Sequence, residues 1–385
     1  MDPGSHHSTR EPQDVPDSGA RPDLDPPAPP QPPAHDVFWV LWGENGLRSG
    51  WLVLIFVSIY YLLLPVFGTI LVAVLPDLAD HPFSPRNMLV GELDPLLAML
   101  AAWFCVARIE HRRVRDYNLT GPNRLPHFLA GFLAGFAAVA VLVGGLAIGG
   151  WARVGHASLS STSLLKYACI WGGAFLLVGL IEEGTFRCFL QFTITRGVNF
   201  WWALAAVSLL CLWLSLKQDA RGAEGVYAAA ALGLLPCWLL HRAATPRWNF
   251  WQAAWVTSTA FGYYHTSNPG ETPVGIFAAA LIGFTFCVAL RMTGSAWWAI
   301  GCHAAWDWAE TFFFGTADSG LVPRGHYLTT TPSGSPLWSG GSDGPEGSLM
   351  VIAVSLLLLA LLIVLYGRRK STLQGMPAAN PMAGS

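Results

Sequence analysis

Residues 171–192 read WGGAFLLVGLIEEGTFRCFLQF, an apolar stretch that contains two adjacent glutamates and one arginine. A membrane-spanning helix needs about 20 predominantly apolar residues. A charge near the centre of such a helix costs about 3 kcal/mol on insertion scales, so ionisable residues inside a span mark functional sites by default. The stretch therefore predicts a membrane helix in which Glu182, Glu183 and Arg187 are functional candidates. The alternative is a charge cluster at a helix end, beside the membrane interface.

The rest of the chain is also rich in apolar segments. Of its 385 residues, 53% are hydrophobic and 12% are charged, whereas a soluble domain carries about 25% charged residues. Backbone groups in lipid must be hydrogen-bonded within their own segment, so we predict an all-α, polytopic membrane helix bundle of eight to ten spans. The candidate spans are residues 50–75, 88–107, 127–150, 163–183, 200–216, 225–241, 249–266, 273–291, 295–314 and 349–366.

Composition divides the chain into six parts. The N-terminal part is rich in Pro and Asp and has almost no large apolar residue, so it cannot bury enough surface to fold and should be disordered. The arginines of 108–115 and 368–370 predict cytoplasmic segments, because Lys and Arg are enriched on that side. In order, the parts are a Pro-rich cytoplasmic tail (1–36), N-terminal transmembrane helices (37–160), a membrane core with the candidate site (161–315), an extracytoplasmic Gly/Ser/Pro-rich loop (316–348), the last transmembrane helix (349–366) and a cytoplasmic tail (367–385). We expect a multi-pass protein of the plasma (inner) membrane with both termini cytoplasmic.

Net charge and cysteine usage exclude several classes of function. The net charge is −2, and no basic patch interleaved with aromatic residues is present, so nucleic-acid binding is not expected. The seven cysteines lie in or beside apolar stretches without CxxC spacing, which argues against a disulfide framework and against a thiolate zinc site. The expected partners are membrane lipid and a membrane-associated protein or peptide.

The two adjacent glutamates should have different roles. Neighbouring helical residues point about 100° apart. Glu183 and Arg187 are four residues apart with the acid first, which is the favourable order for an ion pair on a helix. Glu182 then has no local cation, and an unpaired, poorly solvated carboxylate is suited to act as a general base or acid.

Two further groups carry candidate chemistry. Phe261-Gly-Tyr-Tyr-His265 ends an aromatic-rich span, and His303-Ala-Ala-Trp-Asp307 places an imidazole and a carboxylate on one helical face. Each also has a structural interpretation, as a helix cap for His265 and as polar contacts between helices for the second pair. Sites in helix bundles are built from inward-facing residues of neighbouring helices. Glu182, His265 and His303 lie on three separate predicted helices, and together they could activate a water, directly or through a metal.

Three motifs therefore follow one another, EExxxR at residues 182–187, FxxxH at 261–265 and HxxxD at 303–307. In this order they resemble the CPBP family of intramembrane proteases, which comprises CAAX proteases, among them the type II CAAX prenyl endopeptidases, and bacteriocin-processing enzymes. The resemblance covers roughly residues 165–315. It also includes the flanking sequences SNPGETPVG (267–275) and TGSAWWAIGCHAAWDW (293–308). The resemblance implies an intramembrane endopeptidase that hydrolyses a peptide bond of a membrane-associated protein or peptide.

The resemblance also implies roles for the six motif residues. Glu182 and His265 would activate the attacking water, and Glu183 and Arg187 would brace the site. His303 and Asp307 would bind the oxyanion or hold the group that binds it. The family usually has Asn at the last of these positions. An ionised Asp cannot donate a hydrogen bond to an oxyanion. Asp307 is therefore protonated, or it orients His303, or the oxyanion is bound elsewhere.

The sequence allows two alternatives for metal use and two for the depth of the site in the membrane. The sequence has no HExxH motif. Glu182, His265 and His303 could bind a divalent metal such as zinc and leave a position for water, or they could act without one as a glutamic protease, which we favour. In a ten-span arrangement Glu182 lies near the cytoplasmic side and His265 near the outer side. They can meet if the helix of Glu182 is long, about 163–196, and bent, or if a short span is re-entrant.

Two other functions are compatible with the same residues. A non-catalytic membrane scaffold or immunity-type protein on the same fold is favoured by Asp307. A proton-coupled transporter would use buried Glu and His residues as a relay. Such transporters are built from repeats, and no internal repeat is visible between the halves of the chain.

Overall fold

The computed structural model of the protein describes residues 41–43, 46–79, 81, 83–157, 159–197 and 249–367. Within these ranges the chain is mainly helical, as predicted. The α-helices are α1 (Ser49–Val74), α2 (Pro85–Gly91), α3 (Leu93–Ile109), α4 (Arg124–Ile148), α5 (Ser161–Glu183), α6 (Gln191–Gly197), α9 (Asn249–Tyr264), α10 (Pro273–Thr293), α11 (Trp297–Asp307), α12 (Pro336–Ser339) and α13 (Leu349–Tyr366). Two π-helical segments cover Gly184–Leu190 and Trp308–Phe314, and short 3-10 turns cover Pro76–Ala79, Val114–Asp116, His265–Ser267 and Pro345–Gly347.

Two short antiparallel strand pairs accompany the helices. β1 (Trp42–Gly43) pairs with β2 (Gly46–Leu47) just before α1. β3 (Ala152–Val154) pairs with β4 (Thr330–Pro332), with Ala152 opposite Pro332. The second pair joins the segment after α4 to the long connection between α11 and α13.

Six helical segments are long and apolar enough to cross a membrane among the residues that the structure describes. They are Ser49–Val74, Pro85–Ile109, Arg124–Ile148, Ser161–Gly197, Pro273–Thr293 and Leu349–Tyr366. The predicted spans 249–266 and 295–314 are also helical, as α9 and as α11 with its π segment. The predicted spans 200–216 and 225–241 lie outside the described residues. The chain is an integral membrane protein, while the exact number of spans and the orientation of the termini stay predictions.

One helix is much longer than a membrane span. α5, the first π segment and α6 form one helical run, Ser161–Gly197, of 37 residues. At 1.5 Å per residue this run is roughly 55 Å long, against about 30 Å for the hydrocarbon core of a bilayer. Glu182 therefore lies near the middle of a continuous helix and not at its end. The sequence allowed either a long helix or a re-entrant span to bring Glu182 to the depth of His265, and the structure has the long helix.

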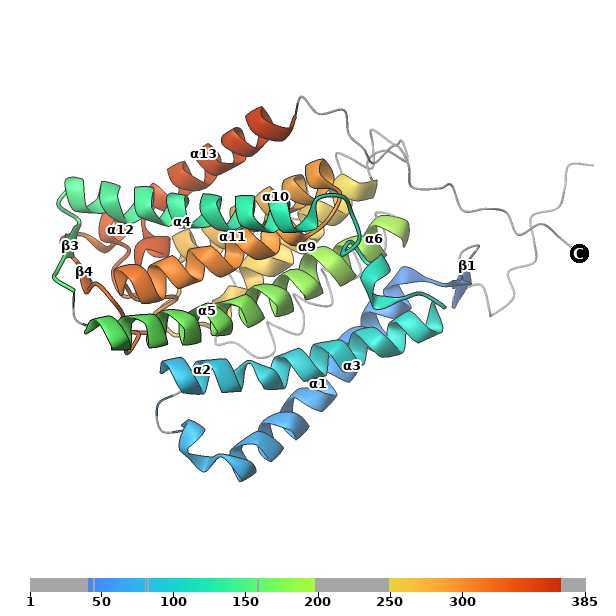
Figure 1. Cartoon of the computed structure of the whole chain (residues 1–385). Coiled ribbons are helices and arrows are strands. Elements are labelled where there is room, and N and C mark those ends of the chain that lie inside the picture. Colours follow the sequence, from blue (N-terminus) through green and yellow to red (C-terminus); the bar gives the residue numbers. More distant parts are fainter. Residues whose placement is uncertain are drawn as a thin grey trace, which may run out of the picture. The chain divides into compact units, whose positions relative to one another are not determined.

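Glycines bring α4 and α11 into close contact. A Cβ atom at Gly131, Gly135 or Gly301 would collide with the backbone of the other helix. Close packing at small residues is typical of membrane helices, because it lets the two backbones approach. The two helices run side by side in Figure 1. Further along α4, by contrast, a Cβ at Gly144 would meet nothing within 4 Å.

The helix that carries His303 lies between two apolar clusters. On one side, Cys302 and Trp306 of α11 pack with residues of α4, α10 and α13. On the other side, Ala296 and Ile300 pack with residues of α1, α3 and the long helix. α11 also contacts α5 directly. The polar residues described next lie where these helices meet.

Candidate active site

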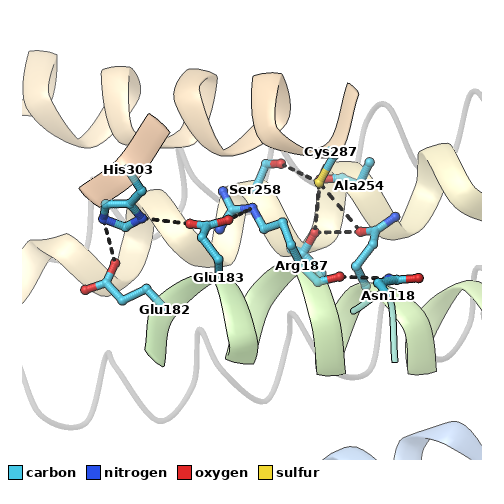
Figure 2. A network of polar contacts seen from close by, with 10 residues as sticks. Asn118, Glu182, Glu183, Arg187, Ala254, Ser258, Cys287 and His303 are labelled. Carbon is cyan, nitrogen blue, oxygen red and sulfur yellow. Dashed lines mark hydrogen bonds and ion pairs between the residues drawn. The ribbon is translucent and has the colours of Figure 1, made fainter. Parts of the chain in front are cut away.

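His303 is the centre of a group of charged side chains. Its Nδ1 lies 2.8 Å from Oε1 of Glu183. Its Nε2 lies 3.7 Å from Oε2 of Glu182 and 3.5 Å from Oδ2 of Asp307. Figure 2 shows the imidazole between the two glutamates of α5. Two of the three predicted motifs, more than a hundred residues apart, therefore meet at one imidazole.

Local helix geometry places these groups on both sides of the contact. Glu182 and Glu183 are the last residues of α5, and Asp307 is the last residue of α11, one turn after His303. A π-helical segment begins directly after each of these ends, at Gly184 and at Trp308. π-Helical turns are rare and often lie at functional sites. Both helices thus change their winding immediately after their site carboxylates.

Arg187 neutralises Glu183 inside the bundle. Its Nε lies 3.2 Å from Oε2 of Glu183, and both side chains are fully buried. The guanidinium carbon lies 4.2 Å from the ring centre of Phe261, 5.3 Å from that of Phe286 and 5.8 Å from that of Phe186. A desolvated guanidinium over aromatic faces gains about 2 kcal/mol per good contact. The predicted ion pair is present, and three aromatic rings enclose its cation.

α10 approaches this guanidinium at a glycine. A Cβ at Gly283 would lie 2.5 Å from an Nη atom of Arg187 and 3.2 Å from the Phe261 ring. Phe286 of the same helix stacks on the His303 ring with centroids 5.9 Å apart. Neither Gly283 nor Phe286 was a candidate in the sequence, because each lies in an apolar run without a motif.

A second set of missed residues continues the polar side of the long helix. Gln191 follows Arg187 by four residues, as Arg187 follows Glu183. Residues at this spacing lie on one helical face, so the spacing could have identified Gln191 as a site candidate. Its amide donates to the Phe250 carbonyl at 3.0 Å and accepts from the Thr257 hydroxyl at 2.9 Å, which ties the long helix to α9. Asn118 donates to the Arg187 carbonyl at 2.8 Å.

His265 lies close to this group without joining it. It occupies the 3-10 turn after α9, and its Nδ1 lies 2.8 Å from the carbonyl oxygen of Phe261. The Phe261 ring contacts both imidazoles, with centroids 4.8 Å from His265 and 6.0 Å from His303. Among the ion pairs of the described residues, none involves His265. The structure thus brings five of the six motif residues into one network and places the sixth beside it, across an aromatic ring.

Exposure increases from one side of the network to the other. The side chains of Glu183 and Arg187 are 0% exposed, that of His303 is 10% exposed, and those of Asp307 and Glu182 are 15% and 19% exposed. The Nδ1 side of the imidazole therefore faces the interior, and the Nε2 side faces the more open part of the site. The two partly exposed carboxylates, Glu182 and Asp307, therefore lie on the Nε2 side, away from the buried ion pair.

The donor set does not form a metal site in this arrangement. Among the described residues, no group of three His, Cys, Asp or Glu side chains is placed so that it could hold a metal ion. Glu182 and His303 are neighbours, but His265 is not part of their contact. Zinc binding by these three residues stays a prediction.

Comparison with known proteins adds an independent observation. Residues 237–309 match a protein-family model described as type II CAAX prenyl endopeptidase Rce1-like. The matched segment includes His265, His303 and Asp307, and it confirms the resemblance to the CPBP and CAAX protease family that the motifs indicate. Glu182 and Glu183 precede it and are joined to it by their contacts with His303, and Arg187 is joined to it through Glu183. Searches of curated proteins and of solved structures gave no match.

Proposed function

We propose that this chain is a CAAX-type intramembrane endopeptidase in which Glu182 and His303 act on a water and a peptide carbonyl. The observation that carries the proposal is the placement of His303. A buried acid holds its Nδ1 at 2.8 Å, and its Nε2 lies between Glu182 and Asp307 at the more open side. The Rce1-like match of residues 237–309 supports the same reaction class.

Glu183 orients the imidazole. The Nδ1–H group donates to Oε1 of Glu183, while Oε2 of the same carboxylate pairs with Arg187. A carboxylate partner of this kind selects one tautomer and one ring orientation. Glu183 therefore acts through His303 and is a positioning residue, as the resemblance implies for it.

The balance of charge favours a protonated imidazole. Three carboxylates, Glu182, Glu183 and Asp307, face one guanidinium and one imidazole. Buried charges are tolerated only when they are paired, so a proton on His303 brings the group close to neutrality. Nε2–H then becomes a donor that can bind the oxyanion of the tetrahedral intermediate. This arrangement supports the interpretation in which Asp307 orients His303 through their ion pair, and the imidazole supplies the donor that Asp307 lacks.

Glu182 is the proposed general base. It is the most exposed of the three carboxylates, and no arginine of the described residues pairs with it. It takes a proton from the attacking water and returns it to the leaving amine, a role that typically contributes about 10²–10⁴-fold. His265 is proposed to share that water with Glu182, which requires the turn that carries it to be held in place.

The proposed substrate is a membrane-associated protein or peptide that approaches from the lipid. A peptide ending in a prenylated CaaX sequence is the first substrate to test, because the matched family model bears that name. The metallo or glutamic character of the enzyme can be tested with the same peptide, by measuring cleavage after exhaustive chelation together with the metal content of the protein.

The decisive test uses purified protein in lipid nanodiscs and an S-farnesylated peptide with a CaaX end. Mass spectrometry detects the released C-terminal fragment. Glu182→Gln keeps the size of the side chain but removes the base, so we expect the rate to fall about a thousandfold. Asp77→Asn is the control, an exposed acid paired with Arg86 outside the His303 group, and it should cleave like the wild type. Equal rates for Glu182→Gln and the wild type would refute the proposed role.

A further inference from the structure

The turn that carries His265 is not fixed by His265 itself. We define the His265 turn as residues 265–272, between the end of α9 and the start of α10. The side-chain hydrogen bonds of His265, Thr266 and Ser267 all go to backbone carbonyls of the preceding helix turn. The position of the imidazole relative to His303 therefore depends on what holds the far end of the turn.

A loop from another part of the chain contacts this far end. The α11–α13 loop comprises residues 315–348, between the second π segment and α13. The Gly270 amide donates to the Ser319 carbonyl at 3.3 Å. The backbones of Gly270 and Gly320 approach so closely that a Cβ on either would collide with the other, and Gly320 has a φ of +89°. This contact can form only with glycine at both positions.

Asp343 joins the loop to the start of α10. Its side chain is fully buried. Oδ2 accepts hydrogen bonds from the Thr272 hydroxyl at 2.7 Å and from the Thr272 amide at 3.1 Å. Thr272 is the N-cap of α10, and its hydroxyl oxygen accepts from the Gly275 amide at 3.1 Å. The Asp343 carbonyl also accepts from the Gly320 amide at 3.2 Å. One residue therefore holds both the turn and the glycine contact.

The same loop is bound to the helix of His303. The Thr311 hydroxyl in the second π segment donates to Oδ2 of Asp318 at 2.7 Å. The indole of Trp306, between His303 and Asp307, donates to Glu346 at 2.7 Å. The loop thus connects the two elements that carry the site histidines.

We propose that the α11–α13 loop positions His265 for the reaction and that Asp343 is the positioning residue. The inference rests on the proposed function, because it takes His265 to act on the water. Asp343 touches no reacting atom in this account and acts through Thr272. The sequence predicts this loop of 34 residues as an extracytoplasmic connection, and the proposal gives it the role of positioning a site residue.

Hydrogen–deuterium exchange of the whole protein tests the contact without any substrate. The exchange of residues 265–275 is compared between the wild type, Asp343→Ala and Asp343→Asn. Loss of a buried hydrogen-bonding partner costs about 1–3 kcal/mol, so exchange in Asp343→Ala should be about 5-fold to 150-fold faster. Asp343→Asn should exchange like the wild type, because its amide oxygen still accepts from Thr272. Asp77→Ala removes an exposed acid and is the matched control.

Cleavage of the farnesylated peptide then tests the consequence. Displacement of a reacting group by about 1 Å can reduce the rate about a hundredfold. We expect kcat of Asp343→Ala to fall between tenfold and a hundredfold with KM within twofold, and Asp343→Asn to stay within threefold of the wild type. If Asp343→Ala does not accumulate, Thr272→Val removes one of the two donors and should loosen the same segment to a smaller extent.

The outcomes separate this inference from the proposed function. Unchanged exchange of residues 265–275 in Asp343→Ala would overturn the role of Asp343, whatever the activity. Faster exchange with unchanged kcat would overturn it as well. By contrast, full activity of His265→Ala would remove His265 from the proposed function and leave the measured contact between the loop and the turn in place.

Discussion

Gly283 offers a sharp test of the buried ion pair, because a single added carbon should disturb it. The Cβ of Gly283→Ala would lie 2.5 Å from an Nη atom of Arg187 and 3.2 Å from Phe261. Heavy atoms in favourable contact are about 3.5 Å apart or more, so the guanidinium must move by about 1 Å. Arg187 is bound to Glu183, and Glu183 is bound to His303, so the displacement reaches the imidazole.

The expected effects on stability and activity can be separated. Gly→Ala inside a helix normally stabilises by up to about 1 kcal/mol, whereas overpacking of a filled interior costs about 1–3 kcal/mol. Gly283→Ala should therefore be neutral or destabilising, and its kcat should fall by up to about a hundredfold because the site is misplaced by about 1 Å. Gly144→Ala is the matched control, since its Cβ would meet nothing within 4 Å.

Thermal unfolding in detergent and cleavage of the farnesylated peptide measure the two effects. We expect Gly144→Ala to unfold at or above the wild-type temperature with unchanged kcat. If Gly283→Ala behaves in the same way, the guanidinium does not occupy the place between Phe261 and α10, and the reasoning about the buried pair is wrong.

Two further predictions concern stability. Glu183→Gln leaves the buried Arg187 without its anion, and breaking a buried pair costs about 3–5 kcal/mol. The unfolding temperature of Glu183→Gln should therefore lie well below that of Glu182→Gln, whose side chain is partly exposed. Equal unfolding temperatures would argue against the pairing. The second prediction concerns Glu271, in the His265 turn, where burial and the nearby Asp343 charge raise the pKa of the carboxyl from 4.5 to about 8. Between these pH values the folded state holds a proton that the unfolded chain has released, so the contribution of Glu271 to stability should fall as pH rises from 4.5 to about 8. Glu271→Gln should flatten this part of a plot of unfolding temperature against pH. An unchanged slope would contradict the raised pKa of Glu271.

Helical spacing made part of the site predictable. Glu183 and Arg187 pair because four residues bring side chains to one helical face, and His303 and Asp307 meet for the same reason. Apolar segments of sufficient length predicted most of the described helices. The continuity of the long helix could not be read from composition, because charges at Glu182 and Glu183 interrupt the apolar run whether the helix ends there or continues.

Contacts between distant segments could not be predicted from the sequence. Glu183 was expected only to brace the site with Arg187, yet it also holds His303, 120 residues away. Asp343 holds Thr272 across 71 residues. Each of these contacts depends on which faces of two helices or loops meet, and side-chain spacing within one segment carries no information on that. The Phe261 ring between the two imidazoles is a further case, since the FxxxH spacing alone does not show where the ring points.

The claim on which the whole account depends is that α5 and α11 meet beside Glu182 and His303. A disulfide between Gly179→Cys and Ala304→Cys measures it directly, because the Cβ of residue 179 would lie 3.6 Å from that of Ala304, within the usual Cβ separation of about 3.5–4.5 Å. The account predicts that mass spectrometry of the oxidised protein finds this cross-linked peptide, and finds none in the control pair Gly144→Cys with Ala304→Cys. A folded double variant that forms no cross-link between residues 179 and 304 would contradict it.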